Sequence, residues 1–209
     1  MNVLMSRLNI VLRDSKGYFF IVLIMFCLGI SFGLYTVKYM GPSDKNDLIN
    51  YFSSFTNSIE NESINYGSLL FEVIKKNMII IVPIIILGMT FFGDPIILII
   101  VLLKGFTLSY TFSFITTTFE GKGVGLAIPA IIPQNLIYIP CIILLGVMSM
   151  EMSTEKFKER FFKNSKTKNT VSSGVLYKFL LIILLFTVGI FIETYISPNL
   201  IKFVAKRFC

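Results

Sequence analysis

The sequence predicts an all-α, polytopic membrane helix bundle, and three observations carry that prediction. The 209 residues are 55% hydrophobic and only 15% charged, whereas a soluble domain carries about 25% charged residues. The mean hydropathy is +0.78. The apolar residues gather in runs long enough to cross a bilayer as helices. We therefore expect one integral membrane domain over residues 1–209, with about five transmembrane helices, an outer amphipathic helix and short interfacial helices at the termini.

The N-terminal segment, residues 1–17, has the pattern of a short amphipathic helix. Leu4, Leu8, Val11 and Leu12 share one helical face, which is typical of a helix on a membrane surface. The next run, 18–37, is too long for a signal peptide, and no small-residue cleavage site follows it. It is therefore predicted as the first span.

Gly29 and Gly33 form a Gly-x-x-x-Gly motif within that span. This motif lets the backbone of a second helix approach closely. The motif is also common by chance, so the alternative is that the two glycines are merely tolerated.

Residues 41–76 form the only sizeable polar loop that the sequence predicts. Its acids outnumber its bases, which favours the outer face under the positive-inside tendency. Helical spacing of apolar residues predicts an amphipathic helix and a partner-binding surface, made of Leu48, Phe52, Phe55 and Ile59. From Phe71 and Ile74 onward the chain is expected to run into the second span as one continuous helix.

The remaining spans are predicted at 78–92, 96–117, 124–148 and 176–196. The tight turn Gly93-Asp94-Pro95 separates the second span from the third, with Asp94 as a helix cap. Residues 150–175 are the most basic segment.

Charge sets the expected orientation. The basic segment 150–175 is placed in the cytoplasm, and the N-terminus lies on the same side. Five spans then put the C-terminal tail outside. Its bases, Lys202, Lys206 and Arg207, would prefer the inside, so the side of the tail stays open.

The fourth predicted span is irregular because it holds Pro129, Pro133 and Pro140. Each proline removes a backbone donor and crowds the preceding turn. The freed carbonyls need partners within the protein, because lipid offers none. The sequence leaves open whether the segment crosses fully or dips as two half-helices.

Lys104 lies near the middle of the third span, where a lysine costs about 2.5–3.5 kcal/mol on insertion scales. Gln134 and Asn135 lie at similar depth in the next span, and their carbonyl oxygens can accept from an ammonium. We predict a buried polar cluster of these three residues. It would serve as a structural network or as a transport or ion site, and snorkelling of Lys104 without contact is the third option.

Glu193 lies near the outer end of the fifth span and is assigned to the same cluster. It is expected either in water at the membrane interface or in a pair with Lys104 or a tyrosine.

The residue inventory disfavours catalysis. The chain has no histidine, and its cysteines, Cys27, Cys141 and Cys209, have neither disulfide nor metal spacing. No nucleophile–base pair or phosphate loop occurs, so we expect no enzyme activity, no metal and no cofactor. The basic residues flank apolar spans, which makes the lipid bilayer the expected partner rather than nucleic acid.

Several short motifs occur in a recognisable order. They are Phe92-Gly93-Asp94-Pro95, Lys104-Gly105-Phe106, Ile132-Pro133-Gln134-Asn135, Ile139-Pro140 and Ile192-Glu193-Thr194-Tyr195-Ile196-Ser197-Pro198. With the Gly29-x-x-x-Gly33 motif in a basic-flanked first span, the chain resembles the stage II sporulation protein M family of endospore-forming bacteria. The resemblance covers nearly the whole chain.

That resemblance implies a membrane scaffold for engulfment, without hydrolase chemistry of its own. Its partners would be the peptidoglycan hydrolases called stage II sporulation proteins D and P, at the mother-cell membrane of the sporulation septum. The alternative is a transporter or channel component with a midplane site at Lys104, Gln134 and Asn135. The sequence gives neither the partner interface nor the oligomeric state, for which a homo-oligomer is one option.

Overall fold

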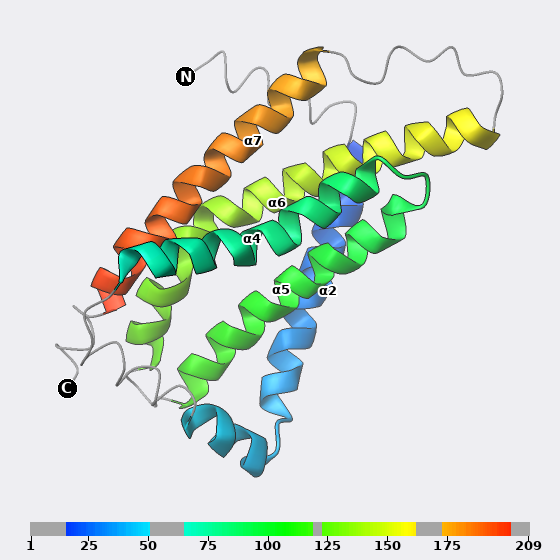
Figure 1. Cartoon of the computed structure of the whole chain (residues 1–209). Coiled ribbons are helices and arrows are strands. Elements are labelled where there is room, and N and C mark those ends of the chain that lie inside the picture. The colour runs from blue at the N-terminus through cyan, green and yellow to red at the C-terminus, as the bar shows by residue number, and fades with distance from the viewer. Residues whose placement is uncertain (1–15, 51–64, 119–122, 162–172, 202–209) are drawn as a thin grey trace.

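The computed structural model describes residues 16–50, 65–118, 123–161 and 173–201. Its named elements are α2 (Lys16–Lys38), α4 (Tyr66–Gly88), α5 (Gly93–Thr118), α6 (Gly123–Phe161), α7 (Ser173–Phe191) and the π-helical turn η1 (Ile192–Ile196). Residues 42–50 add a short helix, and the described ranges contain no strand. The prediction of an all-α bundle is therefore confirmed (Figure 1).

Four helical stretches are long and apolar enough to cross a membrane, judged by length and composition. They are Lys16–Lys38, Gly93–Thr118, Ala127–Lys158 and Tyr177–Ile201. The fifth long helix, α4, has 23 residues but carries charged side chains in its N-terminal half. Large apolar side chains face outward on these helices, such as Phe20 at 62% and Leu136 at 73% exposure. The chain is a multi-pass helical membrane protein.

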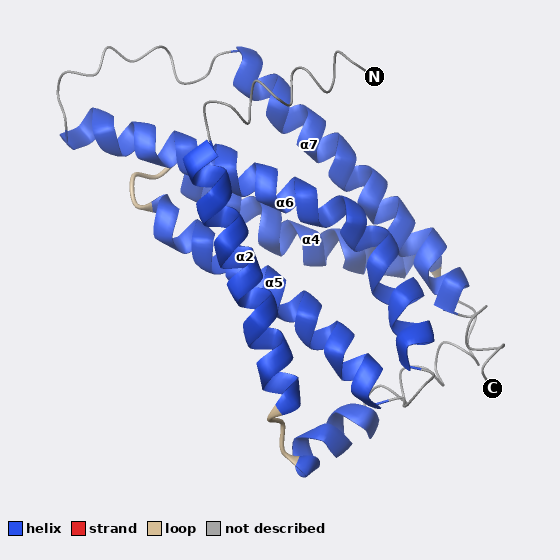
Figure 2. Ribbon diagram, turned by 180° about the vertical axis from the view of Figure 1, so that it is seen from behind, coloured by secondary structure: helices blue, strands red, loops and turns tan. Residues whose placement is uncertain are grey.

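Helix α6 is the centre of the bundle, and it contacts α2, α4, α5 and α7. More than half of its membrane-length stretch is buried, against less than a third in the other three candidates. The helix is continuous although it contains Pro129, Pro133 and Pro140. It bends in its N-terminal half, which holds these prolines (Figure 2). The segment is therefore one bent helix rather than two half-helices.

Predicted boundaries are wrong at two helices, α6 and α4. Helix α6 continues to Phe161, so the start at residue 150 that was expected for the basic loop 150–175 is too early. The composition turns polar there, but Glu, Lys and Arg are good helix formers and prolong the helix.

The other error concerns α4, which begins at Tyr66 and ends at Gly88. The outer loop was expected to reach residue 76, and the second span was placed at 78–92. Asn65 caps the helix, because its Oδ1 accepts from the N–H groups of Gly67 and Ser68 at 3.1 and 3.4 Å. The expected continuous helix through Phe71 and Ile74 is confirmed.

Helices α2 and α5 have the most extensive contact between any two described helices. A Cβ added at Gly29 or Gly33 would lie 2.1 or 2.6 Å from a backbone oxygen of α5. One added at Gly105 would lie 2.4 Å from a backbone oxygen of α2. The two backbones touch, and only glycine fits at these three positions.

The larger buried core joins all the long helices around the middle of α6. It includes Val22 of α2, Ile84 of α4, Val101 of α5, Tyr138 of α6 and Phe186 of α7. Toward the C-terminal ends of α2 and α5, these two helices diverge from α4 and α7 in both views, whereas the bent N-terminal half of α6 stays near α5 (Figure 1, Figure 2).

A smaller core lies between the C-terminal half of α5 and the start of α6. Leu48 and Ile49 of the helix over 42–50 pack against it. Leu48, a predicted partner-binding residue, is thus partly covered by the bundle. The other three candidates, Phe52, Phe55 and Ile59, lie outside the described residues, as do most of the two terminal segments.

Candidate functional site

Glu193 lies in the π-helical turn η1, which follows α7 directly. The sequence explains why a π turn forms at this place. Pro198 has no N–H to donate to the carbonyl of Thr194, and its ring crowds that turn. The N–H of Ser197 instead reaches the oxygen of Ile192. Such π turns are frequent at functional sites, and this one directs a carboxylate into the bundle.

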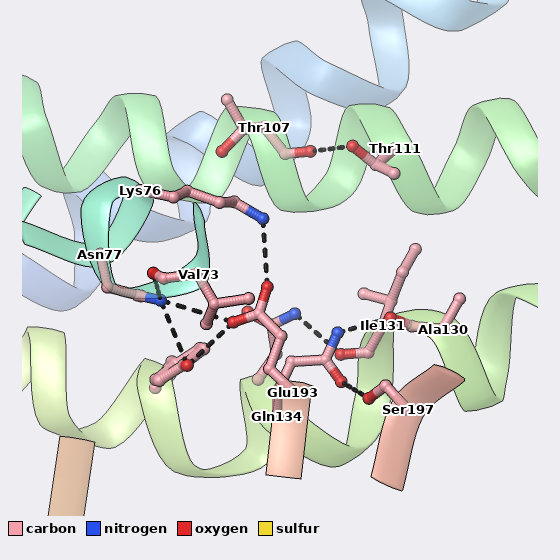
Figure 3. Close-up of polar contacts among 12 residues, drawn as sticks. Val73, Lys76, Asn77, Thr107, Thr111, Ala130, Ile131, Gln134, Glu193 and Ser197 are labelled. Carbon is pink, nitrogen blue, oxygen red and sulfur yellow. Dashed lines mark hydrogen bonds and ion pairs between the residues drawn. The ribbon is translucent and has the colours of Figure 1, made fainter. Parts of the chain in front are cut away.

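The carboxylate of Glu193 accepts from three side chains on two other helices (Figure 3). The hydroxyl of Tyr138 donates to Oε2 at 2.8 Å, and Nδ2 of Asn77 donates to the same oxygen at 3.4 Å. The ammonium of Lys76 lies 3.3 Å from Oε1. We call Lys76, Asn77, Tyr138 and Glu193 the Glu193 cluster.

Burial differs strongly across the Glu193 cluster. Asn77 and Tyr138 are 3% and 1% exposed, whereas the side chain of Lys76 is 68% exposed and that of Glu193 is 14% exposed. The lysine therefore covers the cluster from outside, and its charge balances that of the carboxylate. A buried carboxylate is tolerated when it is paired and hydrogen-bonded in this way.

Asn77 holds the cluster to α4. Its Nδ2 donates to the carbonyl of Val73 at 2.9 Å and to the tyrosine oxygen of Tyr138 at 3.2 Å. The tyrosine hydrogen is then free to point at Glu193. The two amide hydrogens of Asn77 are shared among three acceptors, the oxygens of Val73, Tyr138 and Glu193. None of the buried side-chain atoms without a partner belongs to this cluster.

A second polar pair lies one helical turn away on α6. Ser197, just after η1, donates from Oγ to Oε1 of Gln134 at 2.7 Å, and both side chains are buried. The amide nitrogen of Gln134 donates to the carbonyl of Ala130. Together with the Glu193 cluster, this pair fixes the segment 193–197 to α6.

The structure separates the members of the cluster that the sequence predicted. The amide nitrogen of Asn135 donates to Ile131 of its own helix at 2.7 Å. The ammonium of Lys104 lies 5.8 Å from the centre of the Tyr138 ring. Among described residues the ammonium of Lys104 forms no hydrogen bond or ion pair, so the predicted direct contact with Gln134 and Asn135 is not formed.

The physical reason is that the two amides satisfy carbonyls four residues earlier in α6, the proline-containing segment. Lys104 contacts Tyr138, which lies one turn beyond Gln134 on the same helix face. Lys104 is thus next to the Glu193 cluster but is not part of its hydrogen-bond network. For Glu193 itself, the structure selects the tyrosine partner among the options that the sequence left open.

Sequence reasoning missed four residues of the site: Lys76, Asn77, Tyr138 and Ser197. Asn77 was missed because the second span was expected to begin at residue 78. A polar residue between Val73 and Ile81 is the signal that would have been weighed if the span had been placed earlier in the helix expected from Phe71. Ser197 was part of a recognised motif, but its partner depends on the π turn.

The chemistry of this arrangement is that of a cross-link between helices. In the described ranges, no three side chains of His, Cys, Asp or Glu are grouped so that they could hold a metal ion. The Glu193 cluster joins α4, α6 and η1 by hydrogen bonds among Asn77, Tyr138 and Glu193. Such a network is suited to holding three helices in one arrangement.

The sequence model of one family, described as stage II sporulation protein M, matches residues 22–198. The match includes every residue of the Glu193 cluster and the Gln134–Ser197 pair. No curated protein and no solved structure is significantly similar to the chain.

Proposed function

The chain belongs to the stage II sporulation protein M family, and on that premise we propose that it is a non-enzymatic scaffold for septal peptidoglycan remodelling during engulfment. In this proposal it is a sporulation-related protein of the mother-cell membrane at the septum, with its N-terminus in the cytoplasm. It recruits and anchors two cell-wall hydrolases, stage II sporulation proteins D and P.

The family match over residues 22–198 is the observation that carries the proposal. The Glu193 cluster adds physical support. The Tyr138 hydroxyl, the Glu193 carboxylate and the amide nitrogen of Asn77 bond to one another, which favours a rigid platform over a site that must exchange a ligand. The glycine contact between α2 and α5 supports the same view, because touching backbones resist relative sliding.

The outer segment offers the partner-binding surface in this proposal. The helix over 42–50 is held to the bundle through Leu48 and Ile49. Residues 51–64 follow it and carry the remaining apolar stripe of Phe52, Phe55 and Ile59.

The test replaces residues 51–64 by a Gly/Ser segment of equal length and keeps Leu48 and Ile49, so that the smaller core stays covered. Fluorescent fusions of proteins D and P are then imaged in sporulating cells. We expect both to lose their septal enrichment while the altered protein itself stays at the septum. A matched control replaces residues 162–172, which the proposal places on the cytoplasmic side. Unchanged hydrolase positions in the first variant would falsify the recruitment role.

Transport remains a second candidate because of one observation. Lys104 is a cation in a membrane-length helix, and within the described residues it has no ion pair. Its neighbour is the Tyr138 ring. Purified protein in liposomes distinguishes the two functions, since a solute or ion flux that depends on Lys104 would favour a transporter over a scaffold.

A further inference from the structure

A hollow lies where the turn between α4 and α5 meets the C-terminal part of α6. It has a volume of about 410 Å³ and is lined by Met89, Phe91, Lys156 and Arg160. Lys156 and Arg160 are four residues apart on α6, so they share one helix face. The hollow thus joins an apolar wall from the turn to a wall with two positive charges.

The two cations have no described counter-charge. Neither forms an ion pair with any residue whose side chain the structure describes. The guanidinium of Arg160 lies 5.0 Å from the centre of the Phe91 ring, and stacking of this kind orients the plane of an arginine. Favourable interaction with the C-terminus of α6 explains basic residues in its last turn, but not their position around a hollow.

The hollow is preformed, because the α4–α5 turn is fixed to α6. The N–H of Gly93 donates to Oγ of Ser153 at 3.1 Å, and Oγ1 of Thr154 donates to Oδ2 of Asp94 at 2.8 Å. Asp94, expected as a helix cap, lies in the first turn of α5 and accepts this bond. A Cβ at Gly88 would lie 2.8 Å from Cβ of Ser149, so α4 and α6 are in close contact here.

The position of the hollow indicates the ligand. The turn joins two largely apolar helices at their ends, and large apolar side chains surround it. Met89 and Phe92 are 58% and 61% exposed, and Phe161 on α6 is 58% exposed. An apolar rim beside two unpaired cations at the end of a membrane helix fits a lipid whose headgroup is anionic.

We propose that this hollow binds one anionic phospholipid. Its headgroup phosphate lies between Lys156 and Arg160, and its acyl chains extend along Met89 and Phe92. The site is independent of the scaffold proposal, because it requires neither hydrolase partners nor a particular role for the Glu193 cluster.

The test measures lipid bound to the full-length protein in detergent by native mass spectrometry, as phosphatidylglycerol or phosphatidylcholine with identical chains is added. We expect wild type to retain phosphatidylglycerol preferentially. Each basic residue near an anionic headgroup contributes about fivefold in affinity. Lys156→Gln with Arg160→Gln is therefore expected to weaken phosphatidylglycerol binding by roughly 25-fold and to leave phosphatidylcholine binding unchanged.

A charge-matched control separates a site from general surface charge. Lys158→Gln with Lys178→Gln removes two cations near the same end of the bundle but outside the hollow. Equal loss in both double variants would overturn the proposal. So would equal binding of glycerophosphoglycerol, the same headgroup without acyl chains, because the ligand would then be a soluble phosphodiester. Phe91→Leu retains all charges and is expected to weaken binding about threefold through loss of the arginine stacking.

Discussion

The hydroxyl of Tyr138 donates a 2.8 Å hydrogen bond to Oε2 of Glu193, and this bond connects the bent central helix to the π turn after α7. Helix α7 is shaped to accept the tyrosine. A Cβ at Gly189 would lie 2.4 Å from Cε1 of Tyr138, and the ring of Phe186 stacks on the tyrosine ring at 5.5 Å. Packing against α7 therefore fixes the position of the Tyr138 hydroxyl independently of its hydrogen bond to the Glu193 carboxylate.

Tyr138→Phe is expected to destabilise the protein by about 2 kcal/mol, because it removes a charge-assisted hydrogen bond and leaves a largely buried carboxylate with one donor fewer. Tyr177→Phe is the control, since Tyr177 is 58% exposed and is expected to change stability by less than about 0.5 kcal/mol.

The chain offers its own unfolding probe for this comparison. Cys141 is 1% exposed, and with Cys27 and Cys209 changed to serine it is the single thiol. Its rate of labelling by a fluorescent maleimide in detergent reports opening of the bundle as temperature rises. Equal labelling midpoints for Tyr138→Phe and Tyr177→Phe would contradict a structural role for the bond.

The glycine contact between α2 and α5 gives a second prediction. Gly29→Ala and Gly105→Ala each place a methyl group against a backbone oxygen, at 2.1 and 2.4 Å before relaxation. Each is expected to lower stability at the upper end of the usual overpacking cost of about 1–3 kcal/mol.

Gly17→Ala is the matched control for the glycine variants, because it lies on the same α2 helix and a Cβ there meets no atom within 4 Å. It is expected to be neutral or slightly stabilising, since alanine is the better helix former. The thiol-labelling midpoint measures all three variants. A loss in Gly17→Ala equal to that in Gly29→Ala would show that glycine itself, rather than helix contact, is what matters.

The sequence predicted the helices whose apolar runs are bounded by charge or by a turn. The expected spans 18–37 and 96–117 differ little from α2 and α5. Prediction failed where a helix continues into polar sequence, as α6 does after residue 150. There the composition marks where the apolar run ends, but the backbone hydrogen bonds continue without regard to polarity. The helix before residue 78 was expected only from Phe71 onward, whereas α4 begins at Tyr66.

Of the Glu193 cluster the sequence predicted only Glu193, and of the Gln134–Ser197 pair it predicted only Gln134. Lys104, Gln134 and Glu193 were identified because polar groups in apolar helices need partners. Their pairing depends on the rotation of each helix, which the bend in α6 and the π turn at η1 both change. A single inserted residue rotates everything after it by about 100°, so depth estimated from straight helices cannot identify Tyr138 or Ser197 as partners.

Lys104 and Lys76 are predicted to respond oppositely to removal of their charge. Lys104→Met removes a cation without a described ion pair and retains most of the length of the side chain. Its insertion cost of about 2.5–3.5 kcal/mol exceeds the cation–π gain of about 0.5–2 kcal/mol, so stability is expected to stay equal or rise. Lys76→Met leaves Glu193 without its counter-charge and is expected to lower stability. Labelling of Cys141 ranks the two variants, and a large loss for Lys104→Met would show that its charge contributes to the Glu193 cluster.

The Gln134–Ser197 pair can be tested by a double-mutant cycle, which separates the hydrogen bond from the packing of each side chain. Ser197→Ala leaves Oε1 of the buried Gln134 without its donor, and Gln134→Met removes the acceptor at similar volume. Each single variant should be less stable than wild type, and the double variant should lose less than the sum. Cycles for hydrogen bonds within membranes average about 0.6 kcal/mol, with a maximum near 1.7. We expect about 1 kcal/mol here, because the bond is short and both side chains are almost fully buried.

Thr187→Ala with Gln134→Met is the control cycle, since Thr187 donates only to Ile183 of its own helix. Its coupling should be zero, and an equal coupling in both cycles would mean that the 193–197 segment is held by general packing rather than by this bond.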